Sequence, residues 1–174
     1  MKDLIYCQRQ IPKGKWRYGL RSSAAVGCGW IATYNALRLL GYTVDIPKLI
    51  RYYERQLPII NGNAGTQFWG PAVYFRKWGF PVTLSCFGRN YDRIVGESDV
   101  CILFYRWREK WRFGAHFVAL HYRDGTVTGY NTYRNSVGPD AYGESLEAFL
   151  KKKKYYGTVL LGIRDRRNRK GMER

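Results

Sequence analysis

Apolar positions in the first half of the chain recur every three or four residues, which is the spacing typical of amphipathic helices. This pattern predicts helices over residues 28–40, 45–57 and 72–78, with shorter helical pieces over 90–96 and 145–151. Asp45 and Pro47 are residue types that favour a helix start, and Gly41 and Gly79 favour helix ends. The N-terminal half is therefore predicted to be mainly helical.

The second half consists of apolar runs of strand length, over residues 80–86, 100–105, 116–122, 126–131 and 158–164. Arg123-Asp124-Gly125 is typical of a tight turn, so the runs on either side of it are predicted to form one hairpin. Helices come first and antiparallel strands later. This order predicts an α+β fold in which N-terminal helices pack on a C-terminal antiparallel sheet.

The chain has 174 residues and 45% hydrophobic residues, enough for a single domain with its own core, predicted over residues 1–164. Residues 165–174 contain five basic and two acidic residues and are predicted to form a basic, mobile tail. The N-terminus lacks a signal-type hydrophobic region and no run has membrane-spanning length, which predicts a cytoplasmic protein. The sequence carries no indication of an oligomeric state.

The charge is strongly positive, with 30 Lys and Arg against 13 Asp and Glu, for a net charge of +17. A field of this sign attracts nucleic acids and other polyanions, or anionic membrane surfaces. A soluble protein with a basic surface and a basic tail has the same composition. The charge therefore predicts non-specific polyanion binding and identifies no partner.

A thiol, an imidazole and a carboxamide occupy positions that suit nucleophilic catalysis. Cys28, in Gly-Cys-Gly-Trp, begins the first predicted helix, where unpaired N–H groups and the helix dipole are expected to lower its pKa. His116 opens one strand of the predicted hairpin, and Asn131 closes the other at a similar distance from the turn. Asn131 is therefore expected to hold the imidazole through its side chain, while the other ring nitrogen takes the Cys28 proton.

Each of these residues taken alone is more often structural, and only their joint order favours a Cys–His–Asn site. The other cysteines, Cys7, Cys86 and Cys101, show no metal-ligand spacing, and Cys86 and Cys101 are predicted to be buried in strands. We therefore expect no metal and no cofactor.

The layout resembles the papain-like cysteine peptidases over roughly residues 20–164. The similar features are Cys-Gly at the start of the first long helix, two further helices, Gly-x-His-Phe-Val at 114–118 and a polar residue about fifteen positions later. The bacterial branch that includes the double-glycine leader peptidases of bacteriocin export is the most similar. The resemblance implies a papain-like fold, with Cys28 as nucleophile, His116 as base and Asn131 as orienting residue. It also implies that Tyr133 shields the Asn–His contact from water.

The sequence departs from the family pattern at the oxyanion hole. The family places a Gln a few residues before the nucleophile, whereas Ser22 and Ser23 occupy that stretch here, and Gln8 lies far upstream. The backbone N–H of Cys28 can supply one donor, and Ser22 or Ser23 is the candidate for the second.

Residues 106–113 combine four positive charges, one negative charge and three aromatic residues just before His116. They are predicted to form a loop that borders the cleft and selects acidic or aromatic substrates. A solvated loop and a surface for single-stranded nucleic acid fit the same composition. The cleft candidates are Trp30, Arg106, Trp107, Arg108, Trp111, Arg112 and Tyr133. Lys151–Lys154 is expected to be only the polar end of the last helix.

The sequence therefore predicts a thiol hydrolase. The preferred function is a cysteine peptidase that cleaves a peptide or another amide through a Cys acyl-enzyme. An acyltransferase that uses the same triad is one alternative. A non-catalytic binder of nucleic acid or another polyanion on a peptidase-like fold is the other.

Overall fold

The computed structural model describes residues 3–55 and 65–171. The helical segments of this part are η1 (Gln8–Gln10), α1 (Ser23–Val26), α2 (Cys28–Leu39), α3 (Ile46–Arg55), α4 (Gly70–Lys77), η2 (Gly88–Asn90), α5 (Tyr91–Glu97), α6 (Leu146–Lys153) and η3 (Arg166–Gly171). The strands are β1 (Arg17–Tyr18), β2 (Arg21–Ser22), β3 (Val82–Ser85), β4 (Val100–Glu109), β5 (Arg112–Arg123), β6 (Thr126–Tyr130), β7 (Asp140–Gly143) and β8 (Tyr156–Ile163).

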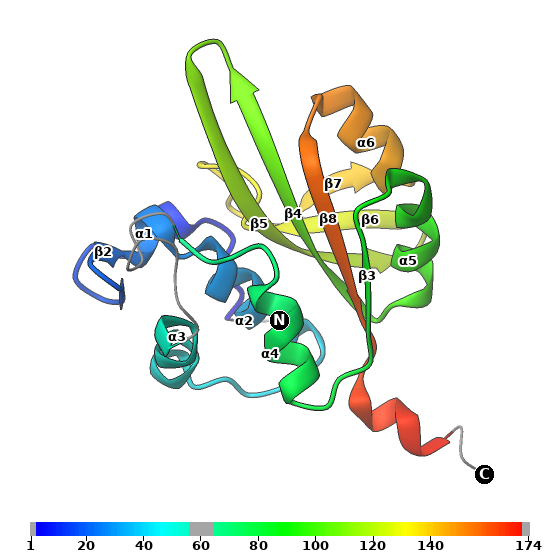
Figure 1. The fold of residues 1–174 in the computed structure, drawn as a ribbon, viewed down its shortest axis with the longest axis horizontal. Coiled ribbons are helices and arrows are strands. Elements are labelled where there is room, and N and C mark those ends of the chain that lie inside the picture. Colours follow the sequence, from blue (N-terminus) through cyan, green and yellow to red (C-terminus); the bar gives the residue numbers. More distant parts are fainter. Residues whose placement is uncertain (1–2, 56–64, 172–174) are drawn as a thin grey trace.

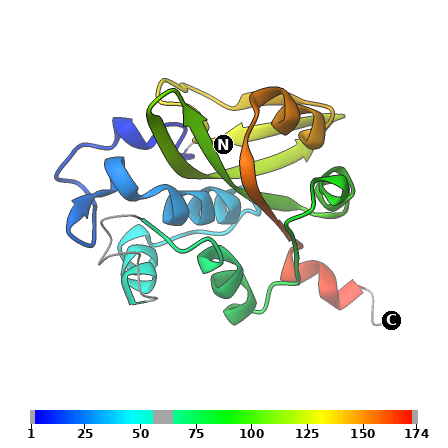
Figure 2. The same cartoon turned by 45° about the horizontal axis from the view of Figure 1, so that its top comes forward.

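Six of these strands form one antiparallel sheet in the order β3-β8-β4-β5-β6-β7, while β1 and β2 form a separate ribbon. Helices α2, α3 and α4 lie on one side of the sheet, and α5 and α6 lie on the other (Figure 1). Figure 2 shows α2 lying along the sheet, where it contacts β5. The predicted α+β fold, with N-terminal helices on a C-terminal antiparallel sheet, is confirmed.

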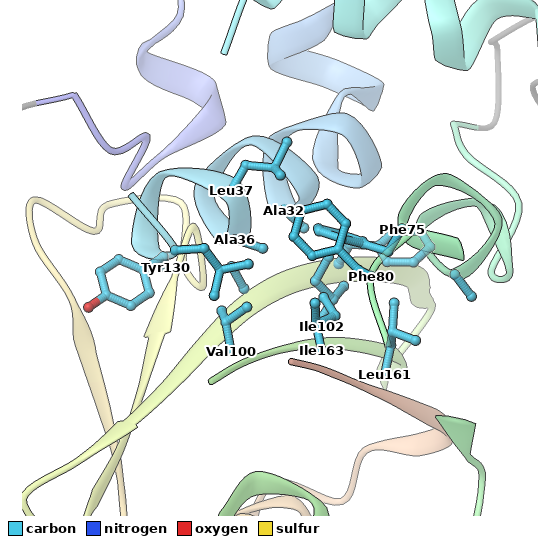
Figure 3. Close-up of a cluster of buried hydrophobic side chains, with 14 of the residues drawn as sticks. Ala32, Ala36, Leu37, Phe75, Phe80, Val100, Ile102, Tyr130, Leu161 and Ile163 are labelled. Atoms are coloured by element: carbon cyan, nitrogen blue, oxygen red, sulfur yellow. The ribbon is translucent and has the colours of Figure 1, made fainter. Parts of the chain in front are cut away.

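The core has a layer on each face of the sheet. Between α2 and the sheet, Ala32 and Ala36 of the helix pack against strand residues such as Ile102 (Figure 3). On the other face, Leu103 and Val118 pack with residues of α5 and α6. Neighbouring residues of a strand point to opposite faces, so covering both faces requires unbroken apolar runs. This explains why β4 and β5 have continuous apolar runs and not an alternating pattern.

The β4–β5 hairpin is longer than predicted. The segment 106–113, expected as a loop, continues both strands until Glu109 lies opposite Arg112 beside the turn. Figure 1 shows this hairpin projecting beyond the neighbouring strands. Trp107 lies over Gly114, where an added Cβ would be 2.7 Å from the indole ring. This close cross-strand packing stabilises the extended pairing.

Two further differences concern the C-terminal part. The short strand β7 was not predicted, because its residues lack an apolar run. The expected mobile tail begins with packed residues, since buried Asp165 accepts a hydrogen bond from the Tyr42 hydroxyl at 2.8 Å and pairs with Arg167. Arg167 also donates to the carbonyl of Leu40. Within the described residues, no helix has both the length and the apolar composition needed to cross a membrane.

Candidate active site

The chain reaches Cys28 through a tightly packed helical turn. Only Gly27 separates α1 from α2, and its N–H donates to the carbonyl of Ser23 at 2.9 Å. A Cβ on Gly27 would lie 2.6 Å from that carbonyl oxygen, and a Cβ on Gly29 would overlap Thr66. Close packing around the start of α2 therefore explains the glycines on both sides of Cys28.

The thiol of Cys28 lies against β5 and is partly buried. Burial raises the pKa of this thiol, and the backbone N–H groups of Phe117, Gly29 and Cys28 itself offset only part of the rise. The predicted lowering of the pKa is therefore wrong. One reason is that α1 precedes α2, which places the free helix N-terminus a turn before the thiol. Cys28 is a neutral thiol at rest.

His116 lies on β5 directly opposite Tyr105 of β4, and the two rings meet edge to face with centroids 5.9 Å apart. Its Nε2 is 2.6 Å from the carbonyl oxygen of Asn131. A carbonyl oxygen can only accept, so Nε2 carries the proton and Nδ1 keeps its lone pair. Burial lowers the pKa of His116 from its ordinary value of 6.5, and the bond to the carbonyl offsets part of this effect. The imidazole is therefore neutral near pH 7 and has one basic nitrogen.

Asn131 contacts His116 through its backbone, whereas the predicted contact used its side chain. A φ of +67° turns the chain out of β6 at this residue. The carboxamide contacts Gln8 instead, accepting from its backbone N–H at 2.7 Å and donating to its Oε1 at 3.3 Å. Tyr130 pairs with Ala119, so Asn131 falls two residues along β5 from the position opposite His116. This register explains why the side chain does not hold the imidazole.

Cys28 and His116 lie close together in the fold but form no hydrogen bond within the described residues. The Cys28 sulfur is at the backbone N–H of Phe117, the residue that follows His116. Phe117 packs in the layer that contains α2, whereas His116 shares its strand face with Tyr105. In an unliganded enzyme such contacts are often long and shorten when substrate binds. Because the two side chains lie on different faces of β5, the imidazole would have to change its orientation to reach the sulfur.

His116 lines a cleft of about 760 Å³. The walls come from the N-terminal segment, the turn at α1, the β4–β5 hairpin, the chain after β6 and the end of α6. Lining residues from these parts include Gln8, Ala25, Trp107, Asn131 and Lys153. The volume is within the range of ligand sites. Cys28 does not line the cleft itself, but Ala25, which precedes it by three residues, does.

The hairpin supplies part of the predicted cleft wall. The residues of the predicted set that line the cleft are Trp107, Arg108, Arg112 and Tyr133. Two other members of the predicted set, Trp111 and Arg106, do not line the cleft. Trp111 is 94% exposed at the hairpin turn, and Arg106 is also exposed. The segment 106–113 therefore contributes to the cleft mainly through residues 107–109 at the end of β4, together with Arg112 at the start of β5.

Trp30 and the two serines lie away from the cleft. Trp30 is fully buried, and its indole N–H donates to Oγ of Ser23 at 3.1 Å. It follows Cys28 by two residues on the helix, which places it on nearly the opposite side. Ser23 is also fully buried, and Ser22 is the N-cap residue of α1 and does not line the cleft. The structure thus gives neither serine a position at the cleft.

Sequence reasoning missed the contribution of the N-terminal segment. Gln8 lines the cleft, binds Asn131 and donates from Nε2 to the carbonyl of Ala24 at 3.3 Å. No local pattern could indicate this, because the contact with Asn131 spans 123 positions. Lys153 and Lys154 were also missed, since the end of α6 lines the cleft and is not only a solvated helix end.

The four cysteines are all unpaired, and their surroundings differ. Cys101 is buried as predicted, and burial raises its pKa to about 12. Cys86 is exposed, contrary to prediction, because it follows the last residue of β3. Cys7 is buried, lines the cleft and donates from Sγ to the carbonyl of Arg134 at 3.0 Å. Within the described ranges, no group of three or more His, Cys, Asp or Glu side chains could hold a metal ion.

Comparisons with known proteins agree with the architecture. Neither the models of known families nor the curated proteins give a match to this chain. Among solved structures, the chain is similar to the crystal structure of the peptidase domain of Streptococcus ComA, a bifunctional ABC transporter involved in a quorum sensing pathway. The TM-score is 0.50 at 14% sequence identity, over 78% of this chain and 90% of that chain. At this identity the likeness concerns the fold alone, and it shows that the chain has a papain-like peptidase fold.

Proposed function

We propose that this protein is a cysteine peptidase that cleaves an amide bond through an acyl-enzyme on Cys28, with His116 as the base. The observation that carries the proposal is the position of the Cys28 thiol, at the start of α2 and against β5 one residue beyond His116. The fold supports the same activity, because it is shared with a peptidase domain. The carbonyl of Asn131 takes the orienting role that the side chain was expected to have.

In the first half of the reaction, the Cys28 sulfur attacks the carbonyl carbon of the scissile amide, and its proton passes to Nδ1 of His116. The backbone N–H of Cys28 donates to the oxygen that becomes negatively charged. The C–N bond then breaks, and His116 returns the proton to the departing amine. The products of this half are a free amine and a thioester on Cys28.

In the second half, water attacks the thioester carbon and gives its proton to His116. The C–S bond breaks, the sulfur takes the proton from His116, and the carboxylic acid is released. If an amine replaces water in this step, the outcome is acyl transfer. The difference between hydrolysis and transfer therefore depends on which nucleophile reaches the thioester.

The directions of the two pKa shifts predict the pH dependence. The neutral form of His116 is the base, and its pKa is lowered below 6.5, so activity should persist below pH 6.5 and fall as the pH drops through the lowered value. The Cys28 pKa is raised, so no loss is expected at mildly alkaline pH. A thiolate–imidazolium pair would instead lose activity there as the imidazolium deprotonates. Measuring kcat/KM from mildly acidic to mildly alkaline pH distinguishes the two.

The proposal is tested by incubating the protein with a complex peptide mixture and identifying new peptide termini by mass spectrometry. Cys28→Ala is the matched control. A parallel sample with hydroxylamine traps a thioester as a hydroxamate on the new C-terminus. New termini and hydroxamates that both require Cys28 are expected. Cleavage that persists in Cys28→Ala, or no cleavage in any mixture, would contradict the proposed function.

A further inference from the structure

The cleft beside His116 has an excess of positive charge. The carboxylate of Glu109 is the one acidic side chain in the lining, against six basic residues, which are Arg9, Arg108, Arg112, Arg134, Lys153 and Lys154. Within the described residues, none of these six forms an ion pair. By contrast, Lys151 of the same α6 end pairs with Glu147 at 2.7 Å. The positive charges of the cleft therefore outnumber its single carboxylate, Glu109, and form no ion pair with it in the described part of the chain.

Among the described residues, one edge of β5 has no strand partner beside the cleft, although the N–H of Phe117 in this stretch faces the Cys28 sulfur. β4 pairs with β5 from Arg112 to Leu120, but β6 pairs with it only from Ala119 onward. In the described part of the chain, no strand pairs with residues 112–118 on the β6 side. An extended peptide can add to such an edge through main-chain hydrogen bonds. A peptide bound there would pass directly beside His116.

The aromatic rings of the cleft are already engaged with other groups. Tyr105 and Tyr155 stack on each other with ring centroids 4.2 Å apart, and Trp107 lies over the backbone of β5. A cleft lysine covers the ring of Tyr133 at 5.4 Å. Binding of single-stranded nucleic acid needs open ring faces on which bases stack, and the exposed ring of Trp111 lies outside the lining. These contacts favour a peptide over a nucleic acid.

From these observations we infer that the cleft binds an acidic peptide segment in extended form. Its main chain pairs with the edge of β5 ahead of His116, which has no partner among the described strands, and its Asp and Glu side chains pair with the cleft cations that form no ion pair. The guanidinium groups of Arg112 and Arg134 suit carboxylates, because each can donate two parallel hydrogen bonds. This inference rests on the proposed function in that it names the substrate class of the same site.

The test measures binding to the full-length Cys28→Ala chain, so that no turnover occurs. The probe is a fluorescein-labelled peptide of five Glu-Ala repeats at physiological salt, compared with the Gln-Ala peptide and with an oligothymidylate that carries five phosphates. The cleft variant is Arg112→Gln with Arg134→Gln. The matched control is Arg93→Gln with Arg123→Gln, which removes the same charge from exposed ion pairs outside the cleft.

The acidic peptide is expected to bind more tightly than both other ligands. The cleft variant should weaken this binding by about tenfold or more, and the control by less than about twofold. Tighter binding of the oligothymidylate would overturn the inference in favour of nucleic acid, and equal weakening in both variants would assign the binding to net charge. Absence of binding would overturn it as well. The measurement does not depend on Cys28, so failure of peptide cleavage is a separate result that contradicts only the proposed function.

Discussion

The two halves of β5 serve different purposes. Residues Phe117–Leu120 are buried on both faces of the sheet and join the two core layers. Residues 112–115 continue beyond the sheet with β4, and Phe113 is 81% exposed. His116 lies at the boundary, where a rigid buried strand positions it and an open cleft reaches its side chain. The comparison teaches that the core fixes where the imidazole sits, while the projecting hairpin determines what can approach it.

The largest expected effect is a difference in cleavage rate between variants of the two histidines of β5, His116 and His121. Replacing Cys28 by Ala or His116 by Gln should lower peptide cleavage by about a thousandfold or more, because each removes a reacting group. His121→Gln, near the other end of β5, should leave the rate within about twofold, since it touches neither the thiol nor the cleft. Rates are measured on the best substrate from the peptide mixture. Comparable losses in His116→Gln and His121→Gln would contradict the claim that His116 alone of the two takes part in the reaction.

The next largest effect is a difference in stability between alanine variants of two phenylalanines of β5. Phe117→Ala should lower the free energy of unfolding by about 3–5 kcal/mol, because it leaves a cavity in the layer under α2. Phe113→Ala should change it by less than about 0.5 kcal/mol, because the ring is exposed. Urea unfolding followed by circular dichroism gives both values. A large loss for Phe113→Ala would mean that the hairpin is part of the stabilising core.

The smallest effect concerns Gln8 of the N-terminal segment, which contacts Asn131 beside His116. Gln8→Ala removes the hydrogen bond from Nδ2 of Asn131, so the carbonyl that holds His116 becomes less firmly placed. We expect kcat to fall about fivefold with little change in KM. The acid limb of the pH profile should also move to lower pH, because the bond to the carbonyl raises the His116 pKa. Gln10→Ala, exposed on the same 3₁₀ turn, is the control, and equal effects in both variants would remove the positioning role.

The apolar pattern was sufficient for the fold, because continuous apolar runs and helical spacing are local signals. The same signals placed Cys28 at a helix start and His116 on a strand. They could not give the orienting atom, which depends on the positive φ of Asn131 and on the register of β5 with β6. They also could not place Gln8, which reaches the site from the other end of the chain. Local patterns thus indicated the elements, and long-range packing determined how the site is assembled.

The raised pKa of Cys28 shows a further limit of sequence reasoning. Its position at a helix start suggested a thiolate, but burial outweighs the backbone N–H groups that face the sulfur. The exposed thiol of Cys86 follows β3, which lies three strands away from β5 and its two histidines. The two cysteines therefore offer an internal comparison of a thiol that depends on a base with one that does not.

The most direct test of the central claim, that His116 activates Cys28, is the rate at which iodoacetamide alkylates Cys28 and Cys86 near pH 7. Mass spectrometry follows both sites in the same molecule, in the unchanged protein and in His116→Gln. We expect the Cys28 rate to fall about a hundredfold in the variant, because the base that takes its proton is gone, while the Cys86 rate stays the same. An unchanged ratio of the two rates would contradict the claim that His116 acts on the Cys28 thiol.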